Sequence, residues 1–328
     1  MKSKKVEPKH LLFCLGILIL VLPLITLILD LPFLCNTLFL CIIYSVMALA
    51  WNLLGGYGGQ IHLGYCAFFG VGAYVTAILA VFYDITPWVG IPIGGAFATL
   101  LSIPLGFAFF KLRKLWFAMA TLTLSTIFTL LFQVLGPGGS VGITLPFSPG
   151  RELYYMSFHG PWVYTYISLL VLMVEIVVLY RLVRGKLGYF LLAIREDEDA
   201  AMAAGINVLK YKMIAMGIGA FIMGIAGGIW VVRFRFIDPY TAFDQINFSL
   251  YIFIASILGG IHHFFGPILG SLILMPLTEY IRVLVVSHFP SYYGLHIMVA
   301  GILFLVISLL LPSGVMPLLE KLLEKSFK

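Results

Sequence analysis

Few side chains inside the long apolar stretches of this sequence could carry chemistry, and the clearest is Glu175 in VLMVEIVVL. A carboxyl group in so apolar a setting is a functional candidate, because burying its charge is costly. It could be neutral by protonation, pair with Gln133 or Asn247, or bind a substrate or an ion. His262 and His263 are less suited to bind a metal, because neighbouring side chains diverge on a helix and no Cys or carboxylate is near in sequence. We therefore predict no metal site and no catalytic residue.

A charged segment, Ile194 to Lys212, stands out between two apolar stretches. Four consecutive acidic residues precede an Ala-rich run, which favours a helix whose positive end lies beside them; they are Glu196, Asp197, Glu198 and Asp199. Gly205 is placed to end that helix in the left-handed conformation. The pattern predicts a short helix from about Glu196 to Ala204. Such a segment is either an ordinary solvated loop or a handle on which a cytoplasmic partner docks.

Two glycine-rich runs interrupt the apolar stretches. The first, WNLLGGYGGQIHLGYCAFFGVGAY, holds Gly55, Gly56, Gly58, Gly59 and Gln60; the second, ILGGIHHFFGPILGS, holds Gly259 and Gly260. Broken helices persist at membrane depth only where protein buries them or water reaches them. These residues are therefore predicted to form a hinge or part of a substrate path, and the alternative is close helix packing.

The composition identifies the elements that must position these groups. Of the 328 residues, 62% are hydrophobic and 10% charged, whereas soluble domains are about one quarter charged. The apolar runs are continuous and reach the length of about 20 residues that a membrane-crossing helix needs. We predict an all-α polytopic membrane protein with spans at about 11–29, 33–54, 61–82, 88–110, 115–135, 162–180, 213–236, 248–261, 265–286 and 295–311. The short span 248–261 could be a half-crossing or join the next one, which leaves nine or ten segments.

The positive charges predict the orientation. A cytoplasmic N-terminus and ten crossings place all but four of the 20 Lys and Arg inside, the exceptions being Arg151, Arg233, Arg235 and Arg282. The net charge of +6 is thereby explained by topology, and nucleic-acid binding is not implied. The predicted division is a cytoplasmic tail at 1–10, one transmembrane domain at 11–311 with a cytoplasmic loop at 181–212, and a cytoplasmic tail at 312–328. The first span is expected to be an uncleaved helix, because no small-x-small cleavage pattern follows it.

Two further features concern the loops and the energy source. The segment of about 136–161 contains GPGGSVGITLPFSPG, whose Gly and Pro content predicts an outward-facing loop or re-entrant segment without regular helix or strand. The sequence contains no phosphate-binding loop GxxxxGK[ST] and no nucleophile elbow. Uphill transport by such a chain would draw on an ion gradient or on a separate ATPase chain.

Taken together, three segments resemble the permease family of branched-chain amino acid ABC importers, specifically its LivM-type subunit. The matching patterns are N-L-L-x-G-Y-x-G-Q-x-x-L-G at 52–64, A-I-R-E-D-E-x-A-A-x-x-x-G-I-N at 193–207, and L-G-G-x-x-x-x-x-G-P-x-L-G at 258–270. The middle pattern contains the E-A-A-x-x-x-G signature with Asp199 in place of Glu. His62 replaces the usual Ser, and His262 and His263 are a second departure.

The resemblance implies a function and a set of partners. This chain would be a permease subunit of the inner membrane, with no ATPase site or cofactor of its own. Its partners would be a second permease of the LivH type, two cytoplasmic ATPases that bind ATP and Mg, an extracytoplasmic solute-binding protein, and lipid. The ATPase-coupling residues would be Arg195, Glu196, Asp197, Glu198, Asp199, Ala200, Ala201 and Gly205. The alternatives are a urea or amide permease of the same family and a proton- or ion-driven secondary transporter that uses Glu175.

Overall fold

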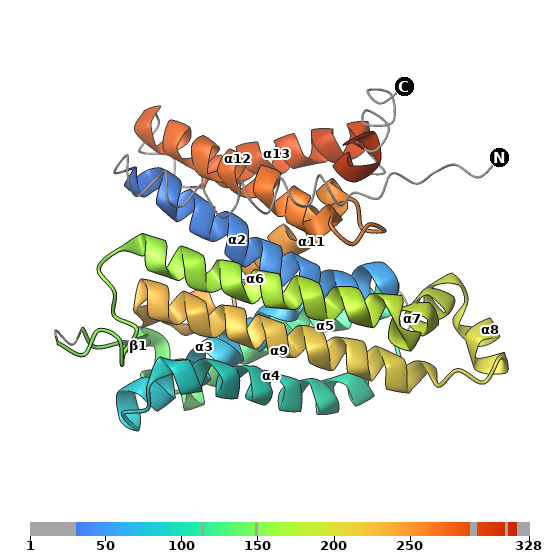
Figure 1. Ribbon diagram of the computed structural model, residues 1–328, viewed down its shortest axis with the longest axis horizontal. Coiled ribbons are helices and arrows are strands. Elements are labelled where there is room, and N and C mark those ends of the chain that lie inside the picture. The colour runs from blue at the N-terminus through green and yellow to red at the C-terminus, as the bar shows by residue number, and fades with distance from the viewer. Residues whose placement is uncertain (1–30, 113–114, 148–149, 289–293, 312–313, 320–328) are drawn as a thin grey trace.

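The computed structural model describes residues 31–112, 115–147, 150–288, 294–311 and 314–319. Long helices lie side by side and give the molecule two distinct ends (Figure 1). The longer helices are α2 Pro32–Asn52, α3 Tyr65–Phe82, α4 Pro87–Phe109, α5 Leu115–Leu135, α6 Pro161–Arg184, α9 Val208–Phe234, α12 Gly266–His288 and α13 Leu295–Leu310. The shorter helices are α7 Lys186–Glu196, α8 Glu198–Ala203, α10 Pro239–Ala242 and α11 Tyr251–Gly259. Two π-helical turns, η1 Leu53–Tyr57 and η3 Ile246–Leu250, extend α2 and precede α11.

Eight helical stretches of the described residues are long and apolar enough to cross a membrane, in agreement with the predicted all-α polytopic class. The predicted first span, 11–29, lies outside the described residues, and α13 is a shorter apolar helix of 16 residues. The predicted short span 248–261 needs correction. It belongs to a 21-residue stretch, Pro239–Gly259, that is long enough to cross by itself, and Gly260 at φ +114 separates it from α12.

The helical stretch begins earlier than predicted because two carboxylates, those of Asp238 and Asp244, cap helix starts within it. Asp238 accepts hydrogen bonds from the backbone of Tyr240 and Thr241, at 2.8 and 3.0 Å. Asp244 accepts from the backbone of Ile246 and Asn247, at 2.8 and 3.1 Å. These side chains satisfy the N–H groups that a helix start leaves open. The same polar residues that lower the hydropathy of this stretch, and so hid its true start from the sequence analysis, therefore stabilise its helices.

Helices α3, α4 and α9 pack at backbone distance, and glycine makes the approach possible. A Cβ on Gly72 of α3 would lie 2.2 Å from the carbonyl oxygen of Gly224 in α9, and one on Gly224 would lie 2.8 Å from the Cα of Gly95 in α4. Small residues at helix contacts are a common basis of association in membranes. Helix α2 is buried over nearly its whole length and lies against α6, α9, α11 and α12 (Figure 1).

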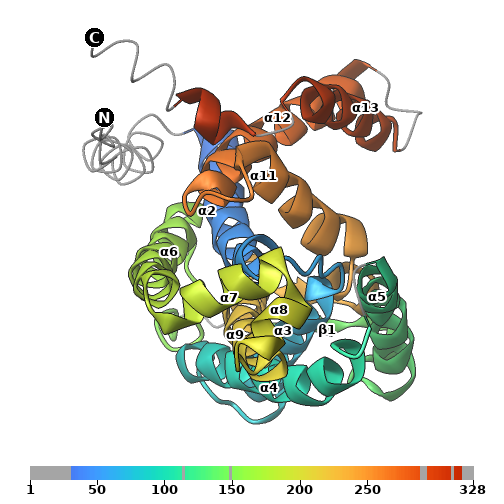
Figure 2. The ribbon, with the colours of Figure 1, turned by 90° about the vertical axis from the view of Figure 1, so that its right-hand side faces the viewer.

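Apolar side chains cover the outer helices. Leu130 and Val134 of α5 and Leu170 and Val174 of α6 are all more than half exposed. Figure 2 shows these two helices on opposite flanks, with α12 and α13 farthest from α4. Exposed aliphatic faces of this kind are suited to contact with lipid tails.

The segment between α5 and α6 contains more regular structure than the sequence predicted. It forms a 3₁₀ turn, η2 Gly139–Val141, and a strand, β1 Ile143–Thr144, which pairs antiparallel with β2 Phe236–Ile237. The prediction that Gly and Pro exclude a strand here was wrong, because the β-branched pair Ile143 and Thr144 lies between those residues and finds its partner after α9. This segment marks the "β1 end" of the molecule, opposite the "α8 end" formed by α7, α8, η1 and the loop 260–265 (Figure 1).

Candidate functional site

The charged segment folds into a helix with both termini capped. Asp197 is extended, and its side chain accepts from the backbone N–H groups of Asp199 and Ala200 at 2.9 and 3.0 Å, so α8 begins at Glu198. At the other end Gly205 has φ +83, and the Gly205 and Ile206 amides donate to the Met202 and Ala201 carbonyls at 3.0 Å each. This pair of bonds is a Schellman motif. The helix is two residues shorter at its start than predicted, because Asp197 serves as its cap.

A small apolar cluster fixes α8 to its neighbours. Ile194 of α7, Ala201 of α8 and Val208 of α9 are buried together, and Ile206 and Tyr211 pack against them. Burial of one side chain from each helix gives this segment its own core. The cluster holds α7, α8 and the start of α9 against one another, which an ordinary solvated loop would not do.

Arg195 connects this unit to the two glycine-rich runs. Its Nη1 donates to the carbonyl oxygen of Gly56 at 3.2 Å and lies 3.0 Å from Nδ1 of His262, while its Nη2 donates to Glu196 at 2.8 Å. A planar guanidinium has enough N–H donors for these three contacts. Gly59 makes room for it: its φ is +67, and a Cβ there would lie 2.7 Å from Cγ of Arg195.

Glu198 makes the second connection. Its Oε1 accepts from Nε2 of Gln60 at 2.8 Å and pairs with the ammonium of Lys212 in α9. The Lys212 side chain is only 2% exposed, and a buried ammonium requires such partners. One carboxylate oxygen thus joins α8 to the segment that follows η1 and to the start of α9.

The loop 260–265 completes the α8 end. Gly259 and Gly266 touch through their backbones, since a Cβ on Gly259 would lie 1.6 Å from the Gly266 carbonyl oxygen. The amide of Asn52 lies 3.5 Å from the His263 carbonyl oxygen. Burial, and then the nearby charges of Arg195 and His263, lower the pKa of His262, and Glu196 opposes them. Because a guanidinium can only donate, the contact with Arg195 requires Nδ1 of His262 to be the acceptor, and the lowered pKa of His262 favours the neutral ring that can accept.

The structure brings the predicted coupling residues and glycine runs to one place. Figure 2, which looks onto the α8 end, shows α7 and α8 in front of the helix ends. Sequence reasoning missed Lys212 as a buried ion-pair partner, and the signal available was its position one helical turn after the Asn207 cap. Nothing in the sequence indicated that the partner of Asn52 lies in the second glycine-rich run.

Glu175 and His62, which the sequence analysis also identified, take no part in these contacts at the α8 end. Glu175 sits in the middle of α6, 4% exposed, and none of the described residues hydrogen-bonds to its oxygens. Of the alternatives for Glu175, pairing with Gln133 or Asn247 is not what the structure shows: neither Glu175 oxygen has a hydrogen-bond partner among the described residues, and Asn247 donates to Asp244 at 2.6 Å. His62 is fully buried among Tyr65, Phe68 and Phe117.

Comparison of the sequence with known proteins identifies the family. Residues 33–308 match the family model described as "Branched-chain amino acid transport system / permease component". The chain belongs to this permease family. It is therefore a multi-pass protein of the cell inner membrane and a transport subunit.

The similar proteins share modest sequence identity over most of their length. The permease LivM of Escherichia coli, named for a high-affinity branched-chain amino acid system, is 29% identical over 303 residues, which cover 85% of this permease and 69% of LivM. A probable LivM of Methanocaldococcus jannaschii is 25% identical over 317 residues, covering 84% and 90%. The L-arabinose permease AraH of Escherichia coli is 26% identical over 242 residues, covering 71% and 70%. No solved structure matches.

Proposed function

We propose that this permease carries branched-chain amino acids through an ABC importer, pairs with a second permease of the LivH type, and receives its power stroke at α8 from cytoplasmic ATPases. An extracytoplasmic solute-binding protein would deliver the solute at the β1 end. The observation that carries the proposal is the pair of connections from α8 to Gly56 and Gln60 through Arg195 and Glu198. A push on α8 reaches the ends of α2 and α11 through hydrogen bonds rather than through a flexible chain.

The surface of the α8 end supports docking of another protein. Tyr189, Met202 and Leu209 expose 68%, 48% and 40% of their surface there. Ala200 and Ala203 between them are also exposed and small. Tyr189 and Met202 belong to α7 and α8, which are not membrane-crossing helices, and Leu209 lies in the first turn of α9. A patch of exposed apolar side chains at such a position commonly marks a protein interface.

The basic side chains support a cytoplasmic position for the α8 end. Among the described residues, more Lys and Arg lie at the α8 end than at the β1 end. Those at the α8 end are Lys111, Arg181, Arg184, Lys186, Arg195, Lys210 and Lys212. Loops rich in Lys and Arg remain on the cytoplasmic side. The ATPases hydrolyse ATP on that side, so α8 faces them.

The glycine run beneath α8 supports a hinge. η1 is a π-helical turn, a rare geometry that is frequent at functional sites. A Cβ on Gly56 would lie 2.0 Å from the Asn52 side chain and 2.4 Å from the Ile261 carbonyl oxygen. Gly55 to Gln60 and Gly259 to Gly260 would turn displacement of α8 into rocking of α2, α11 and α12.

Charge reversal tests this proposal. Asp199→Lys places the wrong charge at the start of α8 and is expected to abolish both leucine uptake and co-purification of the ATPases. The matched control is Glu152→Lys, a reversal in the loop at the β1 end, which should leave co-purification unchanged. Uptake that survives Asp199→Lys and follows an imposed proton gradient would overturn the ABC mechanism in favour of a secondary transporter.

A further inference from the structure

A cavity of about 600 Å³ lies at the β1 end between α2, α9, η3 and α12. This volume is within the range of small-ligand sites, about 300–1,000 Å³. Its walls combine aromatic and aliphatic side chains, such as Tyr44, Trp230 and Met275, with two carboxylates and a guanidinium, from Asp244, Glu279 and Arg282. Charged groups of both signs beside an apolar wall are an unusual lining for a membrane-facing cavity.

The charged groups are held in defined positions. Oδ1 of Asp244 accepts two backbone bonds at the start of η3, and Oδ2 accepts from Asn247 at 2.6 Å. Glu279 pairs with Nη2 of Arg282, one turn farther along α12. The Glu279 side chain is 13% exposed and that of Arg282 is 50% exposed, so the guanidinium has N–H groups open to a solute.

Lipid is an unsuitable neighbour for this lining. Asp, Glu and Arg within membrane segments usually face a bundle interior or an aqueous cavity, because their exposure to hydrocarbon is costly. A water-filled path, which the second permease of the proposed function would close on its far side, satisfies that requirement.

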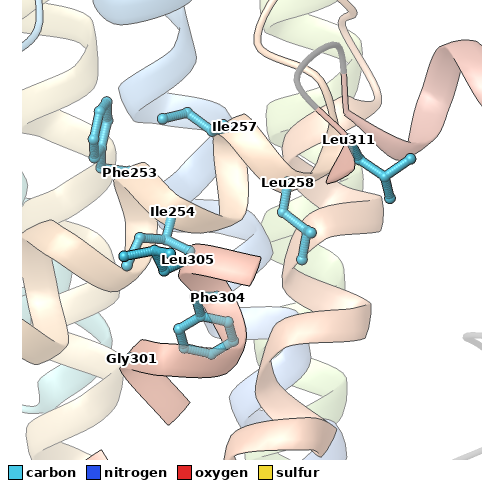
Figure 3. Close-up of a pocket in the computed structure, with 8 residues that line it drawn as sticks. All are labelled: Phe253, Ile254, Ile257, Leu258, Gly301, Phe304, Leu305 and Leu311. Carbon is cyan, nitrogen blue, oxygen red and sulfur yellow. The ribbon is translucent and has the colours of Figure 1, made fainter. Parts of the chain in front are cut away.

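Two other cavities lack this combination. One of about 260 Å³ lies between α11 and α13 and is lined by hydrocarbon side chains and Gly301 (Figure 3). Another, of about 550 Å³, lies between α4, α6 and α9. Among the described residues that line it, Glu175 alone has an ionisable side chain. Neither presents a cation and an anion together.

We propose that the cavity at the β1 end binds a zwitterionic amino acid with an apolar side chain, through Asp244, Glu279 and Arg282. The carboxylates of Asp244 and Glu279 receive the α-ammonium, Arg282 receives the α-carboxylate, and Trp230, Phe248 and Met275 contact the side chain. This assignment rests on the proposed function and adds to it a selective site in the permease itself. The site lies on the proposed route of coupling, because α2 and α11 both contribute lining residues and lead to η1 and to Gly259.

Photolabelling of the assembled permease and ATPase complex in nanodiscs, without the binding protein, tests the assignment. The probe is L-photo-leucine, and its adducts are mapped by mass spectrometry. Adducts are expected on α2, η3 or α12, and unlabelled leucine should reduce them. On the wild-type complex, 4-methylpentanoate, which lacks the ammonium, and isoamylamine, which lacks the carboxylate, should compete far less well than leucine. Equal competition by either analogue, or adducts confined to the other two cavities, would overturn the proposal.

Two variants sharpen the test because they remove charge and keep shape. Asp244→Asn retains an oxygen that can cap η3, and Glu279→Gln retains an acceptor for Arg282. Each is expected to reduce labelling roughly tenfold, as loss of a hydrogen bond to a charged group does, whereas Glu152→Gln should not change it. Labelling that is unchanged in both variants contradicts the assignment. Leucine uptake by the wild-type transporter separates the two proposals: no uptake refutes the solute, while robust uptake without cavity labelling refutes only the cavity.

Discussion

Arg195 donates a hydrogen bond to the carbonyl oxygen of Gly56 across 139 residues of sequence. The bond joins the end of α7 to the π-helical turn that ends α2, at the point where the helix has no further N–H donor to offer its last carbonyl oxygens. Because the same Nη1 lies 3.0 Å from His262, a single side chain connects three segments. These contacts give the proposed motion of α8 a route to the helices that line the cavity at the β1 end.

Arg195→Lys separates this connection from docking. Lysine keeps the charge, but its ammonium cannot reproduce the planar fork that contacts Gly56, His262 and Glu196 together. We expect leucine uptake to fall roughly tenfold while the ATPases still co-purify. Lys186→Arg, at the first residue of α7, is the control and should leave both unchanged. Loss of co-purification together with uptake would place Arg195 in the docking surface instead.

Glu198→Gln probes the ion pair with buried Lys212. The change removes an anionic partner of the ammonium, and breaking a buried pair costs roughly 3–5 kcal/mol. Because the Glu198 side chain is 26% exposed, we expect a smaller loss, about 1–3 kcal/mol, seen as a lower Tm of the purified permease. Glu196→Gln is the matched control, since that side chain is 74% exposed and surface pairs contribute at most about 1 kcal/mol. Equal Tm values for the two variants would contradict the structural role of Glu198.

The pH dependence of stability is expected to reflect His62. Complete burial lowers the pKa of this imidazole to about 3 from its ordinary value of 6.5. Above pH 6.5 the ring is neutral in both the folded and the unfolded chain, so it imposes no cost. As the pH falls from 6.5 towards 3, the unfolded chain binds a proton that the folded chain excludes, and the free energy of unfolding decreases.

His62→Asn tests that assignment. The asparagine oxygen can replace Nδ1 as the acceptor for the Gly64 amide, a bond of 3.1 Å, but it does not titrate. Its Tm should therefore decline less than that of the wild type between pH 6.5 and pH 5. Parallel declines would show that other groups determine the acid sensitivity.

Local rules explain what the sequence predicted well. The acidic residues, the Ala run and Gly205 lie within a dozen positions, so capping preferences alone place α8 to within two residues. The long apolar helices follow equally from hydropathy. Contacts between helices that are distant in sequence depend on tertiary packing, which local sequence rules do not describe. Nothing near Arg195 in sequence indicates Gly56, and the pairing of β1 with β2 depends on where α9 ends. Glu175 shows the same limit, since the cavity that it lines is also lined by α4 and α9, and the approach of those two helices is set by glycine packing.

Backbone contact at Gly259 makes a sharp prediction about folding. A Cβ there would lie 1.6 Å from the Gly266 carbonyl oxygen, and main-chain atoms of two packed helices cannot move aside as a flexible side chain would. Gly259→Ala should therefore sharply reduce the yield of folded permease. Gly301→Ala is the control, because nothing lies within 4 Å of its Cβ position and alanine favours the helix by up to about 1 kcal/mol. Normal yield and Tm for Gly259→Ala would show that α11 and α12 are less closely joined than the structure indicates.

Replacement of Glu175 distinguishes a carboxyl group that takes part in transport from one that only lowers the stability of the fold. Its two oxygens are buried in α6 without a hydrogen-bond partner among the described residues, and an unsatisfied buried polar group costs about 1–3 kcal/mol. Glu175→Met has similar reach and no polar oxygen, so we expect a higher Tm and unchanged ATP-dependent uptake. Glu175→Gln, which keeps a polar group in the same place, should leave Tm nearer the wild-type value. If Glu175→Met instead raises Tm but abolishes uptake, the carboxyl group takes part in transport, and the gradient-driven mechanism regains support.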